Sequence, residues 1–225
     1  MPFDLDQLVL LGEGSRRKCY RLPEGNLCVK FYRRPSEYTK KTTWSVRLHI
    51  FLARFVPSLN VNCHEWRYHQ TLRRTLPSDL FAAFPESLEP VSSREYGWGI
   101  IESLLLNADG TPMRRVIAEM GRTQDPRLRR RLYDEAARLF ERLAEHAVRF
   151  YDPPNVMVQW TGPDAFRLRI VDFEPQGRAL VPGLSYIKPY VRCKVRRRCS
   201  RYLKRLRETY VCAGLADVAP ARPAD

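Results

Sequence analysis

The 225-residue chain lacks a long apolar run, a cysteine pair with metal-site spacing and a group of histidines. Arg54 interrupts the apolar stretch "IFLARFV", so no segment predicts a membrane-spanning helix. The six cysteines form no C-x-x-C pair, and the four histidines do not cluster with them, which argues against a zinc site and a disulfide framework. The opening "MPFDLDQ" is acidic and lacks a basic-then-apolar export signal, so we expect a cytoplasmic protein.

Acidic residues are few relative to basic ones: 25 Asp and Glu against 39 Lys and Arg give a net charge of +14. Such a charge favours polyanionic partners, namely nucleic acid, anionic lipid, lipopolysaccharide or nucleotide phosphates. Nucleic acid is the least favoured, because no recognised nucleic-acid module is present. The 44% hydrophobic content suits one globular unit, or two small lobes sharing a cleft.

The first half of the chain predicts mostly strands, and the second half mostly helices. Residues 8–31 read as three strands joined by a glycine turn and by the turn "PEGN", and residues 91–106 as two more. Helices are expected at 44–56 and 62–76.

In the second half, Asp125-Pro126 predicts the start of a long helix with an apolar stripe. The segments "NVMVQW" and "FRLRIVDF", joined by "TGPD", predict a hairpin. A basic helix is expected to follow at 188–207.

Two glycines and one lysine suggest a phosphate-binding hairpin. Gly12-x-Gly14 lies between two strands, where backbone N–H groups can approach an anion closely, although an ordinary turn fits the same pattern. Lys30 lies in "LCVKF", and alternation places Val29 and Phe31 on the opposite face. A lysine projecting from this strand can reach phosphates under the hairpin.

Glu65 has two alternative interpretations. It can hold the ammonium of Lys30 from the following helix. Alternatively, Asn62-x-x-Glu65 fits a capping box, in which the glutamate bonds back to the N-cap backbone.

Asn155 and Asp172 are expected at the same end of the hairpin formed by "NVMVQW" and "FRLRIVDF". Asn155 lies at the start of its first strand, and Asp172 lies at the end of its second strand. An amide and a carboxylate oxygen beside phosphates suit Mg²⁺. Both residues also occur as simple turn formers.

With these motifs in this order, the chain resembles the protein-kinase-like fold, and more closely the PhoP regulatory network YrbL family of small bacterial kinase-like proteins. The resemblance spans most of residues 8–207 and is carried by "LGEGSRRKCY", "CVKF", "EWRYH", "PPNVMV" and "YVRCKVRRRCSRYLKRL". The stretch before Glu65 and the "VDFE" ending also resemble bacterial kinases that phosphorylate lipopolysaccharide core sugars.

The resemblance implies an α+β, two-lobed fold that binds ATP and magnesium in its cleft. A β-rich N-lobe would cover residues 1–104 and a reduced helical C-lobe 105–211, followed by a disordered tail at 212–225. The implied phosphate-contacting residues are Gly12, Gly14, Ser15, Arg17 and Lys30, with Glu65 paired to Lys30. Asn155 and Asp172 would hold magnesium.

The chain departs from the kinase pattern at three positions. Arg17 replaces the third glycine of the loop, Phe150 occupies the general-base position, and Glu174 follows Asp-Phe. Phenylalanine accepts no proton, and a general base is typically worth roughly 10²–10⁴-fold in rate. Asp152 is the candidate substitute base, with Arg149 offsetting its charge.

The expected function is therefore phosphoryl transfer to a non-protein acceptor such as a lipopolysaccharide core sugar, because little helical sequence remains to dock a peptide. The alternative is a catalytically impaired pseudokinase with a nucleotide-sensing or scaffold role in an envelope-stress network.

The basic segment at 188–207 suggests either a solvated helix face packed on the second lobe or peripheral contact with an anionic membrane or lipopolysaccharide precursor, for instance at the inner membrane. The residues expected to make this contact are Arg192, Lys194, Arg196, Arg197, Arg198 and Arg201.

Overall fold

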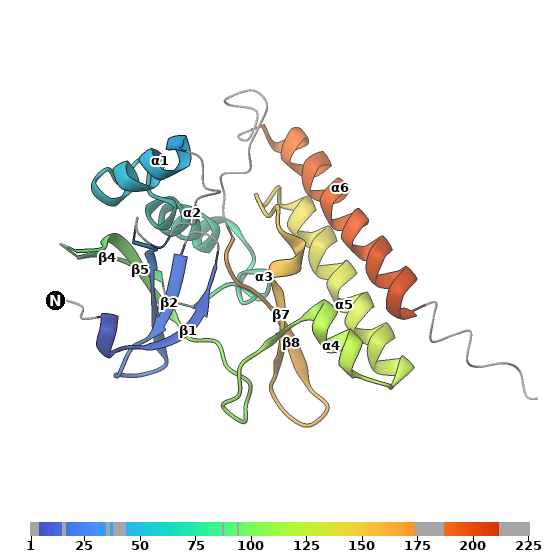
Figure 1. The fold of residues 1–225 in the computed structure, drawn as a ribbon. Helices are drawn as coiled ribbons and strands as arrows, with labels where there is room; N and C mark the ends of the chain where they lie inside the picture. Colours follow the sequence, from blue (N-terminus) through green and yellow to red (C-terminus); the bar gives the residue numbers. More distant parts are fainter. Residues whose placement is uncertain are drawn as a thin grey trace, which may run out of the picture. The chain divides into compact units, whose positions relative to one another are not determined.

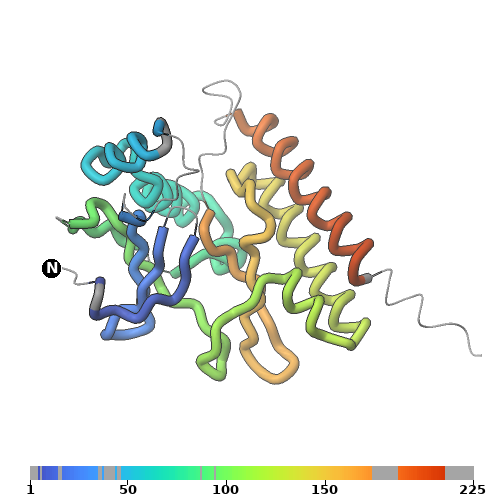
Figure 2. Tube along the Cα trace, in the orientation of Figure 1, coloured from blue at the N-terminus to red at the C-terminus, as the bar shows by residue number. Residues whose placement is uncertain are grey.

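The structure is a computed structural model that describes residues 5–14, 17–34, 37, 44–86, 88–93, 95–173 and 187–211. The described chain divides into two compact units (Figures 1 and 2). Unit 1 comprises the described residues up to Leu105, and unit 2 comprises those from Leu106 onward. The predicted tail at 212–225 lies outside the described residues.

Unit 1 is built on a five-stranded antiparallel sheet with the strand order β1-β2-β3-β5-β4. The strands are β1 (Val9–Glu13), β2 (Arg17–Arg21), β3 (Leu27–Tyr32), β4 (Leu88–Ser93) and β5 (Gly97–Ser103). A short 3-10 turn, Leu5–Gln7, precedes them. The five strands predicted from the glycine turn and the alternating residues are thus confirmed.

The two faces of β3 are buried by different parts of unit 1. Val29 and Phe31 pack with Leu5 and Tyr96 on one face. Lys30 points to the opposite face, as alternation predicts. Both faces of this strand are therefore covered.

Helices cover the Lys30 face of the sheet (Figure 1). They are α1 (Trp44–Phe55) and α2 (Val61–Thr75), and the short α3 (Ser78–Phe81) packs against α2. Ile50 and Ala53 from α1 join Val61 and Tyr32 in one buried cluster. The backbone N–H of Val61 also donates to the Tyr32 hydroxyl at 3.0 Å, which fixes the start of α2 on β3.

The N-cap of α2 is Asn60, whose side chain accepts from the N–H groups of Asn62 and Cys63. Asn62 lies within the helix, so the predicted capping box that begins at Asn62 is wrong. Sequence spacing alone could not distinguish two asparagines two residues apart, because both are good N-cap residues.

The described part of unit 2 combines a three-stranded sheet with three α-helices. The strands are β6 (Arg114–Arg115), β7 (Val156–Trp160) and β8 (Phe166–Ile170), and the helices are α4 (Val116–Arg122), α5 (Pro126–Glu145) and α6 (Lys188–Leu206). A 3-10 turn, Pro153–Asn155, precedes β7, and a π-helical segment, Arg207–Val211, follows α6. Asp125 caps α5 by accepting from the N–H of Arg127 at 2.9 Å, as predicted.

Helices α5 and α6 pack side by side in unit 2 (Figure 1). Leu132, Ala136 and Leu143 of the predicted α5 stripe are buried, which confirms its apolar face. The chain is thus a mixed α+β protein, as predicted, whereas the kinase-like arrangement of lobes stays a prediction. Within the described residues, no helix is long and apolar enough to cross a membrane.

Candidate functional site

The turn between β1 and β2 carries the predicted phosphate-binding glycines. Gly12 pairs with Cys19 across the hairpin, and the N–H of Gly14 donates to the carbonyl of Arg17 at 2.8 Å. A Cβ added at Gly12 would meet no atom within 4 Å, and one at Gly14 would make only an ordinary contact. The fold itself therefore does not require glycine at these two exposed positions. Ser15 lies outside the described residues.

Lys30 forms a buried ion pair with Glu102 of β5. Their Nζ–Oε1 distance is 2.6 Å, and their side chains are only 8% and 7% exposed. Glu102 stands opposite Cys28 on the neighbouring strand, and the Cys28 thiol lies 3.7 Å from the same carboxylate oxygen. The predicted Lys30–Glu65 pair is thus replaced by a pair that the sequence analysis missed. The available signal was a single acid inside the apolar strand "GWGIIES".

Cys28 is a structural thiol. A hydrogen bond with Cys19, followed by burial, raises the pKa of Cys28 far above its ordinary value. The thiol therefore stays protonated and unreactive at neutral pH.

Glu65 pairs with Arg17 rather than with Lys30. The Arg17 guanidinium donates to Oε2 of Glu65 and, at 2.9 Å, to Oδ1 of Asn62. Glu65 is fully buried, and among the described residues its Oε1 has no hydrogen-bond partner. Both predictions for Glu65 are therefore wrong: its carboxylate neither holds Lys30 nor returns to the helix cap. Arg17, predicted to cover phosphates, instead points its guanidinium at α2.

In unit 2, three predicted residues meet at one end of the β7–β8 hairpin. The Asn155 side-chain amide donates to Oδ2 of Asp152 at 3.1 Å and to the backbone carbonyl of Asp172 at 3.4 Å. The Val171 N–H donates to the Asn155 carbonyl at 3.1 Å, which ties the two strand ends together. Asp152 and Asp172 are exposed. We call Asp152, Asn155 and Asp172 the hairpin-end site.

Asp172 adopts an unusual backbone conformation, with φ at +53°. Within the described residues, Ala147 is the only other non-glycine residue with positive φ. Such residues cost free energy and cluster at functional sites, and aspartate tolerates the left-handed region better than most side chains. Here the conformation turns the chain immediately after β8, where Asp172 meets Asn155.

Phe150, which the kinase resemblance places at the general-base position, belongs to the core of unit 2. It is fully buried, and its ring stacks on Phe140 with centroids 6.2 Å apart. Arg149 is half-buried. Position 150 therefore serves packing, and the nearest exposed carboxylate in the sequence is Asp152.

Helix α6 supports the loop that carries Asp152. Arg198 donates a hydrogen bond to the backbone carbonyl of Tyr151, and the Lys194 ammonium lies 4.4 Å from the centre of the Tyr151 ring. Burial, followed by repulsion from Arg198 and Arg197, lowers the pKa of Lys194. The run of basic residues predicted surface positions for Lys194 and Arg198, whereas both contact this loop.

Four of the six residues predicted to contact a membrane are engaged within unit 2, including Arg198, which bonds to the Tyr151 carbonyl. Lys194 is buried, so it is not available to a membrane, and this part of the prediction is wrong. Arg192 donates to the Glu145 carbonyl at 3.2 Å, and Arg196 pairs with Glu141. Arg197 and Arg201 are exposed. These contacts favour the alternative in which the helix packs on unit 2 and presents a solvated face.

The hairpin-end site has the donor set of a magnesium–phosphate site rather than of a transition-metal site. In the described part of the chain, no group of three or more His, Cys, Asp or Glu side chains is arranged to hold a metal ion. Magnesium, however, commonly uses one or two carboxylates, with phosphate and water completing its shell. The Asn155 amide nitrogen donates to Asp152, so the hydrogen bond to that carboxylate does not use its Oδ1. The oxygen donors of Asp152, Asn155 and Asp172 are thus chemically suited to Mg²⁺.

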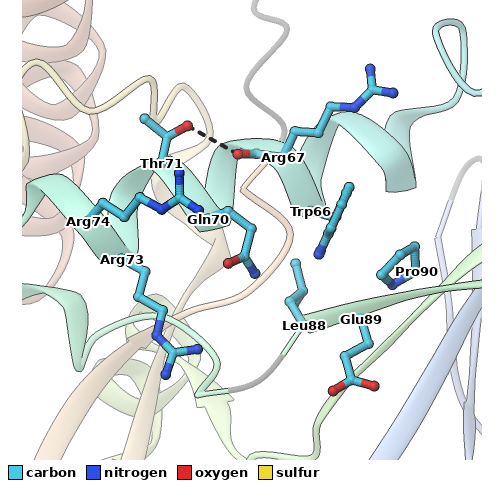
Figure 3. Close-up of a pocket in the computed structure, with 9 residues that line it drawn as sticks. All are labelled: Trp66, Arg67, Gln70, Thr71, Arg73, Arg74, Leu88, Glu89 and Pro90. Carbon is cyan, nitrogen blue, oxygen red and sulfur yellow. Dashed lines mark hydrogen bonds between the residues drawn. The ribbon is translucent and has the colours of Figure 1, made fainter.

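A pocket of about 590 Å³ lies elsewhere, between α2 and β4 in unit 1 (Figure 3). It contains none of the predicted site residues. Trp66, Leu88 and Pro90 provide apolar surface, and Arg67, Arg73 and Arg74 are cationic. Figure 3 shows these three arginine side chains pointing in different directions, so they do not converge on one anion.

A scan against protein-family models and a search of curated proteins both find no match to this chain.

Proposed function

We propose that the chain is a kinase-like protein that binds a magnesium nucleotide and transfers its terminal phosphoryl group to a non-protein acceptor. The supporting observation is the hairpin-end site, where one asparagine amide joins an exposed carboxylate to the backbone of a left-handed aspartate. A simple turn former would not account for all three features together.

Each residue of the hairpin-end site has a distinct proposed role. Asp172 and the Oδ1 of Asn155 bind the cation, which would neutralise phosphate charge when bound. Asp152 accepts the proton of the acceptor hydroxyl, and the hydrogen bond from Asn155 holds its carboxylate in place. Arg149 offsets the charge of Asp152.

In unit 1, the proposed phosphate contacts come from the backbone of the β1–β2 turn at Gly12 and Gly14, where the fold does not require glycine. Lys30 would contribute only after its ammonium leaves Glu102. Contact between Lys30 and a nucleotide would therefore require the Lys30–Glu102 ion pair to break.

The alternative is a pseudokinase that senses a nucleotide or acts as a scaffold in an envelope-stress network. It is favoured by the burial of Phe150 at the general-base position and by the occupied ammonium of Lys30. The two proposals share the magnesium nucleotide and differ in whether phosphate is transferred.

For the enzyme, the proposed acceptor is anionic, such as a lipopolysaccharide core sugar, because the net charge of +14 favours such partners. This part of the proposal rests on the charge and on the resemblance of the motifs.

The test is release and transfer of γ-labelled phosphate from ATP, with and without Mg²⁺, by the intact chain and by Asp152→Asn. Loss of at least 100-fold in turnover with retained nucleotide affinity would support the enzyme. Nucleotide binding without turnover by the unchanged chain would support the pseudokinase. Equal turnover by Asp152→Asn would remove Asp152 from the mechanism.

A further inference from the structure

Helix α1 has two apolar faces, and only one of them packs on unit 1. Ile50 and Ala53 are 1% and 0% exposed, within the cluster that includes Tyr32 and Val61. The second face presents large apolar side chains to solvent: Trp44 at 75%, Leu48 at 38%, Phe51 at 47%, Leu52 at 40% and Phe55 at 60% exposure. Burying the first face therefore does not explain the second.

The exposed residues form one continuous stripe. At about 100° per residue, positions 44, 48, 51, 52 and 55 fall within an arc of about 100°. The rings of Phe51 and Phe55 contact each other edge to face, with centroids 5.4 Å apart. Scattered exposed apolar residues are ordinary, whereas a contiguous stripe marks an interaction surface.

Cations border this stripe, and acids are absent from the surrounding sequence. Arg47 and Arg54 fall beside one edge of the apolar arc, and the Arg54 guanidinium lies 5.9 Å from the Phe55 ring centre. From residue 38 to residue 64 the chain contains no Asp or Glu, but it contains Lys40 and Lys41 in addition to these two arginines. The segment is thus cationic as well as apolar.

We propose that α1 lies in the headgroup region of an anionic phospholipid membrane, with Trp44, Phe51 and Phe55 inserted at the acyl boundary. An interfacial helix combines aromatic and leucine residues on one face with Lys and Arg beside it, as α1 does. The cations add attraction to anionic lipid. A protein groove would satisfy the apolar stripe but would not by itself account for the one-signed charge of the whole segment.

This inference does not depend on nucleotide binding, because α1 contains no residue of the hairpin-end site. It also assigns membrane contact to α1 rather than to α6, where four of the six predicted contact residues are engaged within unit 2. Since α1 has twelve residues, it would lie on the bilayer rather than cross it.

The test is flotation of the full chain with vesicles of phosphatidylcholine alone or of phosphatidylcholine with about 30% phosphatidylglycerol, which supplies an anionic surface. The variant Phe51→Ser/Phe55→Ser removes the paired rings. The matched control is Val9→Ser/Leu10→Ser, which removes apolar side chains that are 66% and 47% exposed on β1. All four changes are at exposed positions, and circular dichroism checks that each variant is folded.

We expect the intact chain to float with anionic vesicles and the Phe51/Phe55 variant to partition at least tenfold more weakly, while the control floats normally. Trp44 fluorescence should shift to shorter wavelength on binding and lose that shift in Trp44→Phe. The proposal is overturned if both double variants float equally well, or if the intact chain does not float with anionic vesicles. A dimer that dissociates in the Phe51/Phe55 variant would instead assign the stripe to a second copy of the chain.

Discussion

Replacing Arg17 by methionine should strongly destabilise unit 1. The change removes the guanidinium that contacts Glu65 and leaves a carboxylate with 0% exposure without its cation. Breaking a buried ion pair in this way costs about 3–5 kcal/mol, because the remaining charge stays uncompensated. The Arg17 side chain is 13% exposed, so some water can reach the site, and we expect a loss near the lower limit, about 3 kcal/mol.

The converse change should cost less, and the double change should recover stability. In Glu65→Met, the freed guanidinium can turn toward solvent, since Arg17 is not fully buried. In Arg17→Met/Glu65→Met, no charge remains and two apolar side chains can pack together, which is often neutral relative to the ion pair. The expected order of stability is therefore the intact chain and the double variant first, then Glu65→Met, then Arg17→Met.

Urea unfolding followed by tryptophan fluorescence measures this order, because Trp66 lies on α2 next to Glu65. A loss of about 3 kcal/mol corresponds to a midpoint lower by roughly 1–3 M at the usual urea dependence. An Arg17→Met chain that unfolds within about 0.3 M of the unchanged protein, or a double variant no more stable than Arg17→Met, would refute the buried pair.

Three further outcomes follow from described contacts. Burial lowers the pKa of His69 below 6.5, so as pH falls below that value the unfolded chain takes up the proton first and the folded state loses stability. Urea midpoints at pH 7.5 and 5.5 should show this loss in the control variant His146→Gln, because His146 is exposed, but much less in His69→Gln. Phe150→Asp should unfold unit 2 by burying a charge rather than restore a general base, and circular dichroism would measure the unfolding. A folded variant that is more active than the unchanged chain would contradict this expectation. Gly97→Ala should cost several kcal/mol in urea unfolding, because Gly97 has φ of +73° and its added Cβ would lie 2.4 Å from the Arg54 carbonyl oxygen; an unchanged midpoint would contradict this contact.

Periodicity and turn chemistry predicted most of the local structure. The alternation around Lys30 correctly separated the two faces of β3, and Asp125-Pro126 correctly marked the start of α5. These features are local, so each can be inferred from a few neighbouring residues. The two-residue strand β6 and the four-residue helix α3 were missed, because elements this short carry no periodic signal.

The buried ion pairs could not be predicted from spacing, because they depend on which strands are neighbours. Pairing of β3 with β5 places Glu102 beside Lys30, and the position of α2 places Glu65 beside Arg17. Sequence order offered Glu65 as the first acid after Lys30 on a helix, and this order was misleading. In contrast, Asn155 and Asp172 were placed together correctly, since the ends of one hairpin must meet.

Lys194 illustrates the same limit for charge. Its basic neighbours predicted a surface residue, yet its stem lies on the buried side of α6 and its ammonium rests against Tyr151. Helical periodicity places Lys194 on the same face of α6 as Val191 and Val195, which are also buried. A lysine on an apolar stripe can therefore be a core residue when an aromatic face is available.

Calorimetric titration of ATP into the intact chain, with and without Mg²⁺, tests the hairpin-end site most directly. Asp172→Asn should bind the magnesium nucleotide at least tenfold more weakly, while Asp164→Asn, an exposed aspartate in the turn at the opposite end of the same hairpin, should bind it normally. Binding that does not require Mg²⁺, or that is equal in the two variants, would contradict a cation site at Asp152, Asn155 and Asp172.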